Sequence, residues 1–408
     1  MRGRAGALPA PLDRATPIVV LGLGRGLFHH GVLGIARSAG RLGVPVYRVG
    51  LERWAPAAAS RYVTGWEVVP EAASHEQILD TLGDISERIG PALLVAADDA
   101  ACVFVDEHAG VLASEYLLAS QPVGLARMLA SKRGMYELCQ THGVPTPRST
   151  FPQTEEDVLA HAEQIGLPTV LKCVNAADAP IFSPRVSIAQ TRQELIESYR
   201  QMQPPQMSNV LLQEYVPGAP ETVWMFNGYF DAQSECKVGF TGKKIRQSPP
   251  YTGATTLGEC LPNSTVYETT VRFMRAIGYR GILDIGYRFD RRDGQYKLLD
   301  VNPRIGGTFR LFVDEHGMDV LRALHLDLTG REVPANSSPD GRRWVVEPLD
   351  VASSIVYARR RDITLGGWAR SFRGVREAAW FALDDIAPFL ALLPALLLDR
   401  AANGGEAR

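Results

Sequence analysis

The sequence predicts an α/β domain on a parallel sheet, followed by a two-lobed α+β region and a partly helical C-terminal extension. Three observations support this fold class. The chain opens with a strand, a glycine turn, a helix and a second strand; helices and strands mix after residue 121; and helical character returns after residue 336. We place the domain boundaries at 1–120, 121–216, 217–335 and 336–408. Several domains are expected, because one core usually holds about 100 to 200 residues.

The composition is that of an ordinary globular protein. Hydrophobic residues make up 46% of the 408 residues and charged residues 22%, and the formal net charge is −2, from 43 basic against 45 acidic side chains. This balance excludes a disordered or fibrous chain. It also leaves no broad basic face to replace the counterions of nucleic acid, so we expect no nucleic-acid partner.

The five cysteines are widely spaced, with no pairing typical of zinc ligands, and therefore indicate reduced thiols in a cytoplasmic protein. The N-terminal residues lack the apolar core of a signal peptide. The run 386–398 contains thirteen residues and two prolines, too few for the roughly 20 residues that span a bilayer. We expect no membrane span. This run is either a helix packed on its own protein, a homodimer contact or a foot on a membrane surface.

In the first domain we expect strands at 17–23, 44–49 and 92–97 and a helix at 31–42, which together form a parallel βαβ arrangement. The turn at 22–26 resembles a dinucleotide fingerprint, but Leu27 stands where its third glycine belongs. A nicotinamide dehydrogenase is therefore disfavoured. The glycines either allow a close turn or also contact a ligand, and His29 and His30 either touch a substrate or are structural.

The next two regions mix helices and strands, which predicts two α+β lobes. In the smaller lobe we expect helices at 123–142, 154–165 and 191–202 and strands at 148–150, 168–172 and 210–215. In the larger lobe we expect a helix at 267–277 and strands at 222–230, 237–242, 281–289 and 295–301.

Two lysines are candidates for phosphate binding. Lys172 follows an apolar strand and either neutralises a phosphate or reaches water, because a buried ammonium without a partner is costly. Lys132 begins a helix, where free N–H groups already favour an anion. In addition, the strand ending at Glu214 can present its edge to an adenine, and Glu221 can accept hydrogen bonds from ribose; alternatively Glu214 is a surface charge.

The strongest local pattern is a pair of polar strand ends. Asp284 lies within an apolar strand, and Asp300 and Asn302 share one face of the next strand, because side chains alternate along a strand. Hard oxygen ligands of this kind suit Mg²⁺. The alternative is a salt-bridged Asp284 and an Asn302-Pro303 turn, although an aspartate among isoleucine and leucine is costly unless it has a partner.

Five segments occur in order: Lys132 before GVPTP, LPTVL before Lys172, QEYVPG with Glu221, KKIRQSPP, and LLDVNPR. In this order they resemble the ATP-grasp superfamily, in particular the carboxylate–amine ligases of the D-aspartate ligase type. The resemblance implies a pre-ATP-grasp domain, a two-lobed ATP-grasp fold and the C-terminal helical extension. It covers about seven tenths of the chain.

The resemblance also implies residue roles. ATP would lie between the two lobes, with one or two Mg²⁺ ions, which Mn²⁺ could replace. The implied contacts are Lys132 and Lys172 on phosphates, Glu214 on the adenine amino group, Tyr215 and Val216 against the base, Glu221 on the ribose, Asp284, Asp300 and Asn302 on the metal, Arg304 on the transferred phosphate or the acceptor carboxylate, and Lys244 and Arg246, on one strand face, on the same phosphates.

The sequence departs from the family pattern at two places. Asp300 stands where the family usually has glutamate, which shortens the reach of the carboxylate by about 1.5 Å. The loop at 175–180 lacks the glycines that usually let backbone amides close over phosphates. The nucleotide site is therefore expected to follow the family more closely than its lid.

The implied reaction is ligation of small carboxylates and amines, such as amino acids. ATP would convert the carboxylate to an acyl phosphate, and the amine would then displace phosphate, so that an amide, ADP and phosphate are the products. The sequence shows no Ser-His-Asp or Cys-His arrangement, and this reaction needs no side-chain nucleophile. Two alternatives remain: a small-molecule kinase on the same scaffold, and a non-catalytic nucleotide-binding regulator. Gly306 and Gly307 are either part of a substrate pocket or an ordinary tight turn.

Overall fold

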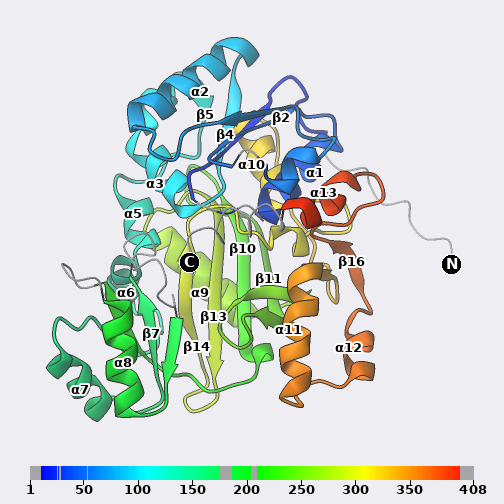
Figure 1. Cartoon of the computed structure of the whole chain (residues 1–408). Helices are drawn as coiled ribbons and strands as arrows, with labels where there is room; N and C mark the ends of the chain where they lie inside the picture. The colour runs from blue at the N-terminus through cyan, green and yellow to red at the C-terminus, as the bar shows by residue number, and fades with distance from the viewer. Residues whose placement is uncertain are drawn as a thin grey trace, which may run out of the picture. The chain divides into compact units, whose positions relative to one another are not determined.

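The computed structural model describes residues 11–395 apart from 25, 27–28, 53, 175–185 and 204–208. The loop at 175–180 and the last residues of the run at 386–398 therefore lie outside the described residues. The chain divides into two compact units. Figure 1 labels the helices and strands along the chain. The larger unit comprises Met1–Ala126, Met225–Asp284 and Asn302–Arg408, and the smaller unit comprises Arg127–Trp224 and Ile285–Val301.

The larger unit begins with a parallel five-stranded sheet in the order β3-β2-β1-β4-β5. Its strands are β1 (Ile18–Gly22), β2 (Val46–Gly50), β3 (Gly65–Val68), β4 (Ala92–Ala96) and β5 (Tyr116–Leu117). Every residue of β1 is buried, as expected for a parallel strand covered on both faces. The predicted βαβ opening is confirmed.

Helices cover both faces of this sheet. The core on one face includes residues of α1 (His30–Gly40) and α10 (Val320–Leu328), and the core on the other includes residues of α2 (His75–Ile89), α3 (Asp99–Glu107) and α4 (Ala109–Leu112). The N-terminus of α2 has a capping box, in which Ser74 and Gln77 each satisfy the other's backbone N–H. The connecting loops of this domain lie at the ends of its strands.

The smaller unit contains an antiparallel four-stranded sheet in the order β6-β9-β7-β8. Its strands are β6 (Ser149–Thr150), β7 (Thr169–Cys173), β8 (Val186–Ala189) and β9 (Val210–Glu214). Buried residues of α7 (Glu155–Gln164) and α8 (Arg192–Met202) pack with this sheet in one apolar core. The predicted α+β lobe is therefore present.

The helix predicted at 123–142 is instead two helices, α5 (Leu125–Ala130) and α6 (Lys132–Thr141). Ser131 separates them and caps α6, because its hydroxyl accepts a hydrogen bond from the N–H of Gly134. A Cβ at Gly134 would lie 2.5 Å from the carbonyl oxygen of Met128, so the two helices meet where only glycine fits. Lys132 consequently stands at the N-terminus of a helix, as predicted.

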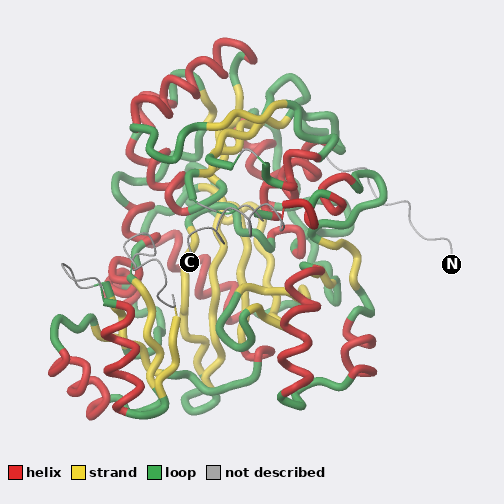
Figure 2. The backbone as a smooth tube through the Cα atoms, viewed as in Figure 1, coloured by secondary structure: helices red, strands yellow, loops and turns green. Residues whose placement is uncertain are grey.

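A seven-stranded sheet has the order β14-β13-β10-β11-β12-β15-β16, and Figure 2 shows its strands in yellow. Its strands are β10 (Val223–Phe230), β11 (Cys236–Ser248), β12 (Ala254–Cys260), β13 (Gly281–Asp290), β14 (Gln295–Asn302), β15 (Arg343–Val345) and β16 (Val375–Ala378). The boundary between the two compact units falls within β10, β13 and β14. The helix between β12 and β13 is α9 (Ser264–Ala276).

The C-terminal extension contains α11 (Glu347–Arg359), α12 (Leu365–Ser371) and α13 (Ala387–Leu390), and α11 contacts β11 (Figure 1). The extension also supplies β15 and β16, which lengthen the large sheet and were not predicted. β15 has only three residues, too few to show the alternation by which strands are recognised. The extension therefore belongs to the larger unit.

All five cysteines are free thiols, as expected. Burial raises the pKa of Cys102, Cys139, Cys236 and Cys260 to about 12, so these thiols stay protonated at neutral pH. None of the described helices is both long enough and apolar enough to cross a bilayer.

Candidate active site

Two of the predicted metal ligands, Asp284 and Asn302, are joined in the larger unit. Asp284 lies on β13, Asn302 ends β14, and the side-chain amide of Asn302 donates a hydrogen bond of 3.2 Å to Oδ2 of Asp284. After β14 the chain turns so that Gly306 lies against this carboxylate, and a Cβ at Gly306 would collide with it. This close approach gives a physical reason for the glycine beyond an ordinary turn.

Arg304 lies beside these oxygens. Its Nε donates to Asp99 at 2.7 Å and one terminal nitrogen donates to Oδ1 of Asn302 at 3.3 Å. Burial lowers the pKa of Arg304, but the Asp99 carboxylate outweighs burial and the pKa is raised overall. Because Asp99 begins α3, the arginine connects the end of β14 with the five-stranded sheet domain and remains a permanent cation.

In the smaller unit the ammonium of Lys132 forms an ion pair with the carboxylate of Asp300. Lys132 begins α6 and Asp300 lies on β14, and both side chains are partly exposed. One predicted phosphate-binding lysine thus holds one predicted metal-binding carboxylate. Opposite charges that can be reached by solvent can exchange partners when a charged ligand arrives.

The other predicted nucleotide contacts also lie in the smaller unit. Lys172 is half-buried on β7, Tyr215 is half-buried just after β9, and Val216 is buried. Glu221 is exposed within a short 3₁₀ helix, Pro220–Thr222. Lys172 thus lies on the four-stranded sheet, Tyr215 and Val216 directly follow its strand β9, and Glu221 lies between β9 and β10; their contacts with a nucleotide stay a prediction.

Glu214 is buried at the end of β9 and already has cationic partners. It accepts hydrogen bonds from Arg148 at 3.3 Å and from Arg292 at 2.7 Å, and Lys297 lies 3.8 Å away. Burial alone would raise the pKa of Glu214, but Arg148 and Lys297 lower it overall. Glu214 is therefore not a surface charge, and its three partners were not predicted from the sequence.

Lys297 explains why the hairpin between β13 and β14 belongs to the smaller unit. Besides Glu214 it contacts Asp290 at 2.7 Å and Asp293 at 3.0 Å, and it is almost completely buried. The backbone N–H of Leu298 also donates to the carbonyl of Pro145 at 2.7 Å. The only sequence signal for this network was the clustering of opposite charges around the hairpin turn.

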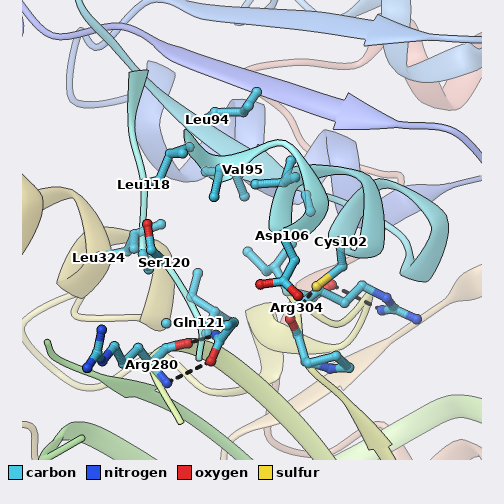
Figure 3. Close-up of a pocket in the computed structure, with 18 residues that line it drawn as sticks. Leu94, Val95, Cys102, Asp106, Leu118, Ser120, Gln121, Arg280, Arg304 and Leu324 are labelled. Carbon is cyan, nitrogen blue, oxygen red and sulfur yellow. Dashed lines mark hydrogen bonds between the residues drawn. The ribbon is translucent and has the colours of Figure 1, made fainter. Parts of the chain in front are cut away.

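A pocket in the larger unit adjoins Arg304 (Figure 3). Most of its walls are apolar side chains from β4, α3 and the segment after β5, and the thiol of Cys102 donates to the carbonyl of Pro303 at 2.9 Å. At one end Gln121 hydrogen-bonds with the backbone of Arg280 (Figure 3). This lining offers apolar contact close to the predicted site rather than a phosphate cradle.

Comparison with known proteins gives both a sequence relative and structural neighbours. D-aspartate ligase from Enterococcus faecium (strain Aus0004) is 24% identical over 328 residues, which covers 75% of this chain and 77% of the relative. N5-carboxyaminoimidazole synthetase from Staphylococcus aureus, complexed with ADP, has a TM-score of 0.61 at 11% identity and covers 86% of this chain and 98% of its own. The chain has the ATP-grasp fold.

A second structural neighbour of the same fold is the L-amino acid ligase from Bacillus licheniformis. Its TM-score is 0.57 at 17% identity, and the match covers 78% of this chain and 75% of that one. No protein-family model matches the chain. The ATP-grasp resemblance inferred from the five ordered segments is therefore confirmed at the level of the fold, and the chain is similar in sequence to D-aspartate ligase.

Arg246 occupies a different environment from the one expected. Its Nε and one terminal nitrogen donate to the two carboxylate oxygens of Asp350 at 2.8 Å, and its other terminal nitrogen donates to Ser371 at 2.7 Å. The side chains of Arg246 and Asp350 are 3% and 1% exposed. In this ATP-grasp fold the arginine therefore holds α11 and α12 on the large sheet.

Lys244 also departs from simple alternation, because the strand pairing between β11 and β12 shifts between Lys244 and Arg246. Its ammonium donates to the carbonyl of Gly253 at 3.1 Å. A register shift of this kind re-aims side chains along a strand, so two residues at i and i+2 need not face one site. The expectation that both side chains face the same phosphates stays untested for Lys244.

The glycine turn after β1 holds the protein's own carboxylates. The N–H of Gly24 donates to Asp98 at 2.9 Å, and that of Gly26 donates to Glu52 at 2.8 Å. Asp98 also caps α3 through the N–H of Ala101 at 2.9 Å. Two amides that would hold a pyrophosphate in a dinucleotide fold are thus bonded to the protein's own carboxylates.

Among the described residues, no group of three or more His, Cys, Asp or Glu side chains lies close enough to hold a metal ion. The predicted set of Asp284, Asp300 and Asn302 contains two carboxylates and one amide, so it is of a different kind. Such a set suits Mg²⁺ only together with phosphate oxygens and water.

Proposed function

We propose that this protein is an ATP-dependent ligase that joins a small carboxylate to an amine. ATP converts the carboxylate to an acyl phosphate, and attack by the amine then forms an amide and releases ADP and phosphate. The observation that carries the proposal is the sequence match to D-aspartate ligase along three quarters of both chains. The ATP-grasp fold supports it, as does the L-amino acid ligase among the structural neighbours.

In the proposed complex the smaller unit supplies most nucleotide contacts. Lys132 and Lys172 bind the phosphates, Tyr215 and Val216 pack against the base, and Glu221 accepts the ribose hydroxyls. Val216 is buried and apolar and Glu221 is an exposed carboxylate, which suits these two tasks. We propose that Glu214 contributes to the adenine contact while Arg148, Arg292 and Lys297 fix its carboxylate in place.

The residues fit a Mg²⁺ ion by the chemistry of their donor atoms. Asp284, Asp300 and Asn302 offer hard oxygen atoms, and Gly306 leaves no room for a side chain over the carboxylate of Asp284. Mg²⁺ neutralises and orients phosphate oxygens in reactions of this class. In the protein alone, the ion pair of Lys132 with Asp300 and the hydrogen bond of Asn302 with Asp284 hold these groups.

Arg304 is a cation of the larger unit that donates a hydrogen bond to Asn302, one of the predicted metal ligands. We propose that it holds either the transferred phosphoryl group or the acceptor carboxylate, since its pKa is raised and it donates toward Asn302. Phosphoryl transfer asks the protein chiefly for positioning and neutralisation of charge. We propose a structural role for Arg246 instead, because Asp350 and Ser371 already accept hydrogen bonds from its guanidinium.

The test is to incubate the purified protein with ATP, Mg²⁺ and pools of amino acids, other small carboxylates and amines. ADP and free phosphate are measured, and mass spectrometry searches for products lighter than the summed substrates by one water. We expect phosphate release that requires both a carboxylate and an amine. Asp300→Ala should abolish it, whereas Glu268→Gln, which alters an exposed carboxylate on α9, should not.

The remaining outcomes separate the alternatives. A phosphorylated product with ADP and no free phosphate would establish the kinase. Tight ATP binding without turnover in any pool would favour the non-catalytic regulator or a substrate outside the pools. AMP and pyrophosphate as products would rule out the acyl-phosphate route.

A further inference from the structure

The five-stranded sheet has a topological switch point between two of its strands. The strand order β3-β2-β1-β4-β5 reverses direction between β1 and β4. In open parallel sheets, ligands bind outside the carboxyl ends of the strands at this point. Here the carboxyl ends carry the glycine turn after β1, Arg48 on β2, and Asp98 after β4. We call this place the switch-point crevice, defined by Gly22, His29, Arg48 and Asp98.

Two glycines leave the space that the side chain of Arg48 occupies in the crevice. A Cβ at Gly22 would lie 2.7 Å from one guanidinium nitrogen, and a Cβ at Gly50 would collide with the guanidinium. Both glycines end strands, so the arginine lies across the ends of β1 and β2. Its side chain is backed by the ring of Trp66, 5.6 Å from the guanidinium carbon. Because Gly22 and Gly50 have no side chains, the guanidinium of Arg48 can occupy this position.

The partners of Arg48 are weak for a charge that is only 4% exposed. Glu52 lies 3.5 Å away, the carbonyl of Gly22 lies 3.4 Å away, and Nε has no hydrogen-bond partner within the described part of the chain. Burial lowers its pKa, and Glu52 and Asp98 compensate only in part. A buried cation with long contacts is costly, and a further anion would relieve that cost.

Arg37 shows how the same protein treats a buried arginine with a purely structural task. It is 2% exposed, and its guanidinium makes four hydrogen bonds of 2.7 to 3.1 Å, to Asp385 and to backbone carbonyls. Arg48 is equally buried but has no contact of that quality among the described residues. The difference between these two side chains points to a missing partner at Arg48.

His29 and α1 add two further incomplete groups. Nδ1 of His29 is buried without a partner among the described residues, and burial, Arg304 and Arg48 lower the pKa of His29 to about 4, so its ring is neutral. The eleven-residue helix α1 begins just after it, with neither a side-chain cap nor an acidic residue in its first turn. An uncapped helix N-terminus favours an anion.

A carboxylate completes the crevice. Asp98 is held by the backbone N–H of Gly24, and its charge acts on Arg48. The crevice therefore presents a cation and a helix N-terminus together with an acidic group and a neutral imidazole. A molecule carrying both a carboxylate and an amine matches this distribution better than a simple anion does.

We propose that the switch-point crevice binds the amine substrate as an amino acid, with Arg48 as the charge partner of its carboxylate. This inference rests on the proposed ligase function and narrows its amine to amino acids. The carboxylate supplies the acceptor that Nε of Arg48 lacks, and the amine end faces His29 and Asp98. Arg48 is then a specificity-determining residue, because it binds a group that takes no part in the bond being formed.

The test compares wild type, Arg48→Met and Glu52→Gln. Saturation-transfer NMR measures binding of pooled L- and D-amino acids, each at about 1 mM, with ADP and Mg²⁺ present, and of the amines that lack the α-carboxylate. We expect at least one amino acid to bind wild type and Glu52→Gln. Its binding to Arg48→Met should be at least tenfold weaker, consistent with loss of a charge-assisted hydrogen bond. The matched amines should bind all three proteins equally weakly.

Glu52→Gln is the matched control, because it removes the one ion-pair partner that Arg48 has among the described residues but keeps an acceptor for Gly26. If Arg48 serves only that ion pair, both variants lose stability together and amino-acid binding is alike in both; this result overturns the proposal. Binding of no amino acid by wild type also overturns it. Arg48→Lys, which keeps the charge, should recover part of the binding.

Failure of this inference is distinguishable from failure of the ligase proposal. ADP binding to Arg48→Met, measured by thermal shift, reports whether the variant is folded and its nucleotide site intact. If phosphate release requires an amine that lacks a carboxylate, the ligase function is supported, and the proposed binding of a substrate carboxylate by Arg48 is ruled out. In steady-state measurements of phosphate release, KM for the amino acid should rise at least tenfold in Arg48→Met, while KM for ATP stays unchanged.

Discussion

Arg246 and Arg304 were predicted to do the same work, and the structure places them in opposite surroundings. Arg246 is paired with both oxygens of the nearly fully buried Asp350 and also with Ser371. Arg304 forms an ion pair with the half-exposed Asp99 and also donates a hydrogen bond to the side-chain oxygen of Asn302. The difference teaches that a charge with a complete, buried set of partners holds the architecture, whereas a charge with exposed partners can exchange them for a ligand.

The largest effect is expected from Arg246→Met, on stability. Removing one member of a buried ion pair typically costs about 3–5 kcal/mol, because the other charge is left buried alone. Thermal denaturation should show a marked loss, and Arg246→Met with Asp350→Leu should lose less than the sum of the single changes. The phosphate-release activity per folded molecule should persist; its disappearance at full stability would erase the distinction between the two arginines.

Arg304→Met should act on catalysis instead. We expect phosphate release to fall roughly 100- to 1,000-fold, the usual effect of losing one group that stabilises developing charge. The unfolding temperature should change little, because Asp99 is half-exposed and can be solvated. Arg304→Lys should recover part of the activity. An equal loss of stability in Arg304→Met and Arg246→Met would contradict our reading of the two environments.

Gly306→Ala sharpens the comparison at Asp284. The new methyl group would collide with the carboxylate, so either the loop or Asp284 must shift. Overpacking of this kind costs about 1–3 kcal/mol. We expect a higher requirement for Mg²⁺ in the phosphate-release assay. Gly366→Ala, at a glycine whose added Cβ has nothing within 4 Å, is the control and should behave as wild type.

The smallest effect concerns the partly exposed Asp384, which anchors the segment before α13. Hydrogen bonds from Arg41 and Tyr62 hold its pKa well below its usual range, although burial opposes them. Its contribution to stability is therefore complete above the pKa of the unfolded chain, about 4, and is lost as pH falls below that value. Solvent screening limits it to ~0.2–1 kcal/mol. Asp384→Asn should be less stable than wild type at pH 7, and the difference should close in acid; a difference independent of pH would refute this.

Local patterns in the sequence predicted most of the long elements. The strands at 17–23, 92–97, 281–289 and 295–301 correspond to β1, β4, β13 and β14, because apolar runs and alternation extend over enough residues to be recognised. The three-residue β15 and the break at Ser131 were missed, since each depends on packing against distant or neighbouring backbone. Element length was not the whole cause, because the fifteen-residue helix α2 and the seven-residue strand β12 were not predicted either.

The candidate site shows a different limit. Asp284 and Asn302 were predicted to act together, and their hydrogen bond is present, although metal binding stays a prediction. The partner of Arg246 lies 104 residues away, and no local pattern indicates it. Arg48 was overlooked, although an arginine in an apolar strand that ends in glycine was a usable signal. Side-chain chemistry can be read locally, but the choice of partner depends on the tertiary fold.

The two short strands of the C-terminal extension have a practical consequence for anyone who shortens this chain. β12 pairs with β11 on one side and with β15 on the other. A fragment that stops at residue 335 would turn β12 into a bare sheet edge of seven residues, five of them buried in the intact protein. Exposed edges of this kind recruit strands from other molecules, so such a fragment is expected to form aggregates even though it retains every predicted nucleotide and metal ligand.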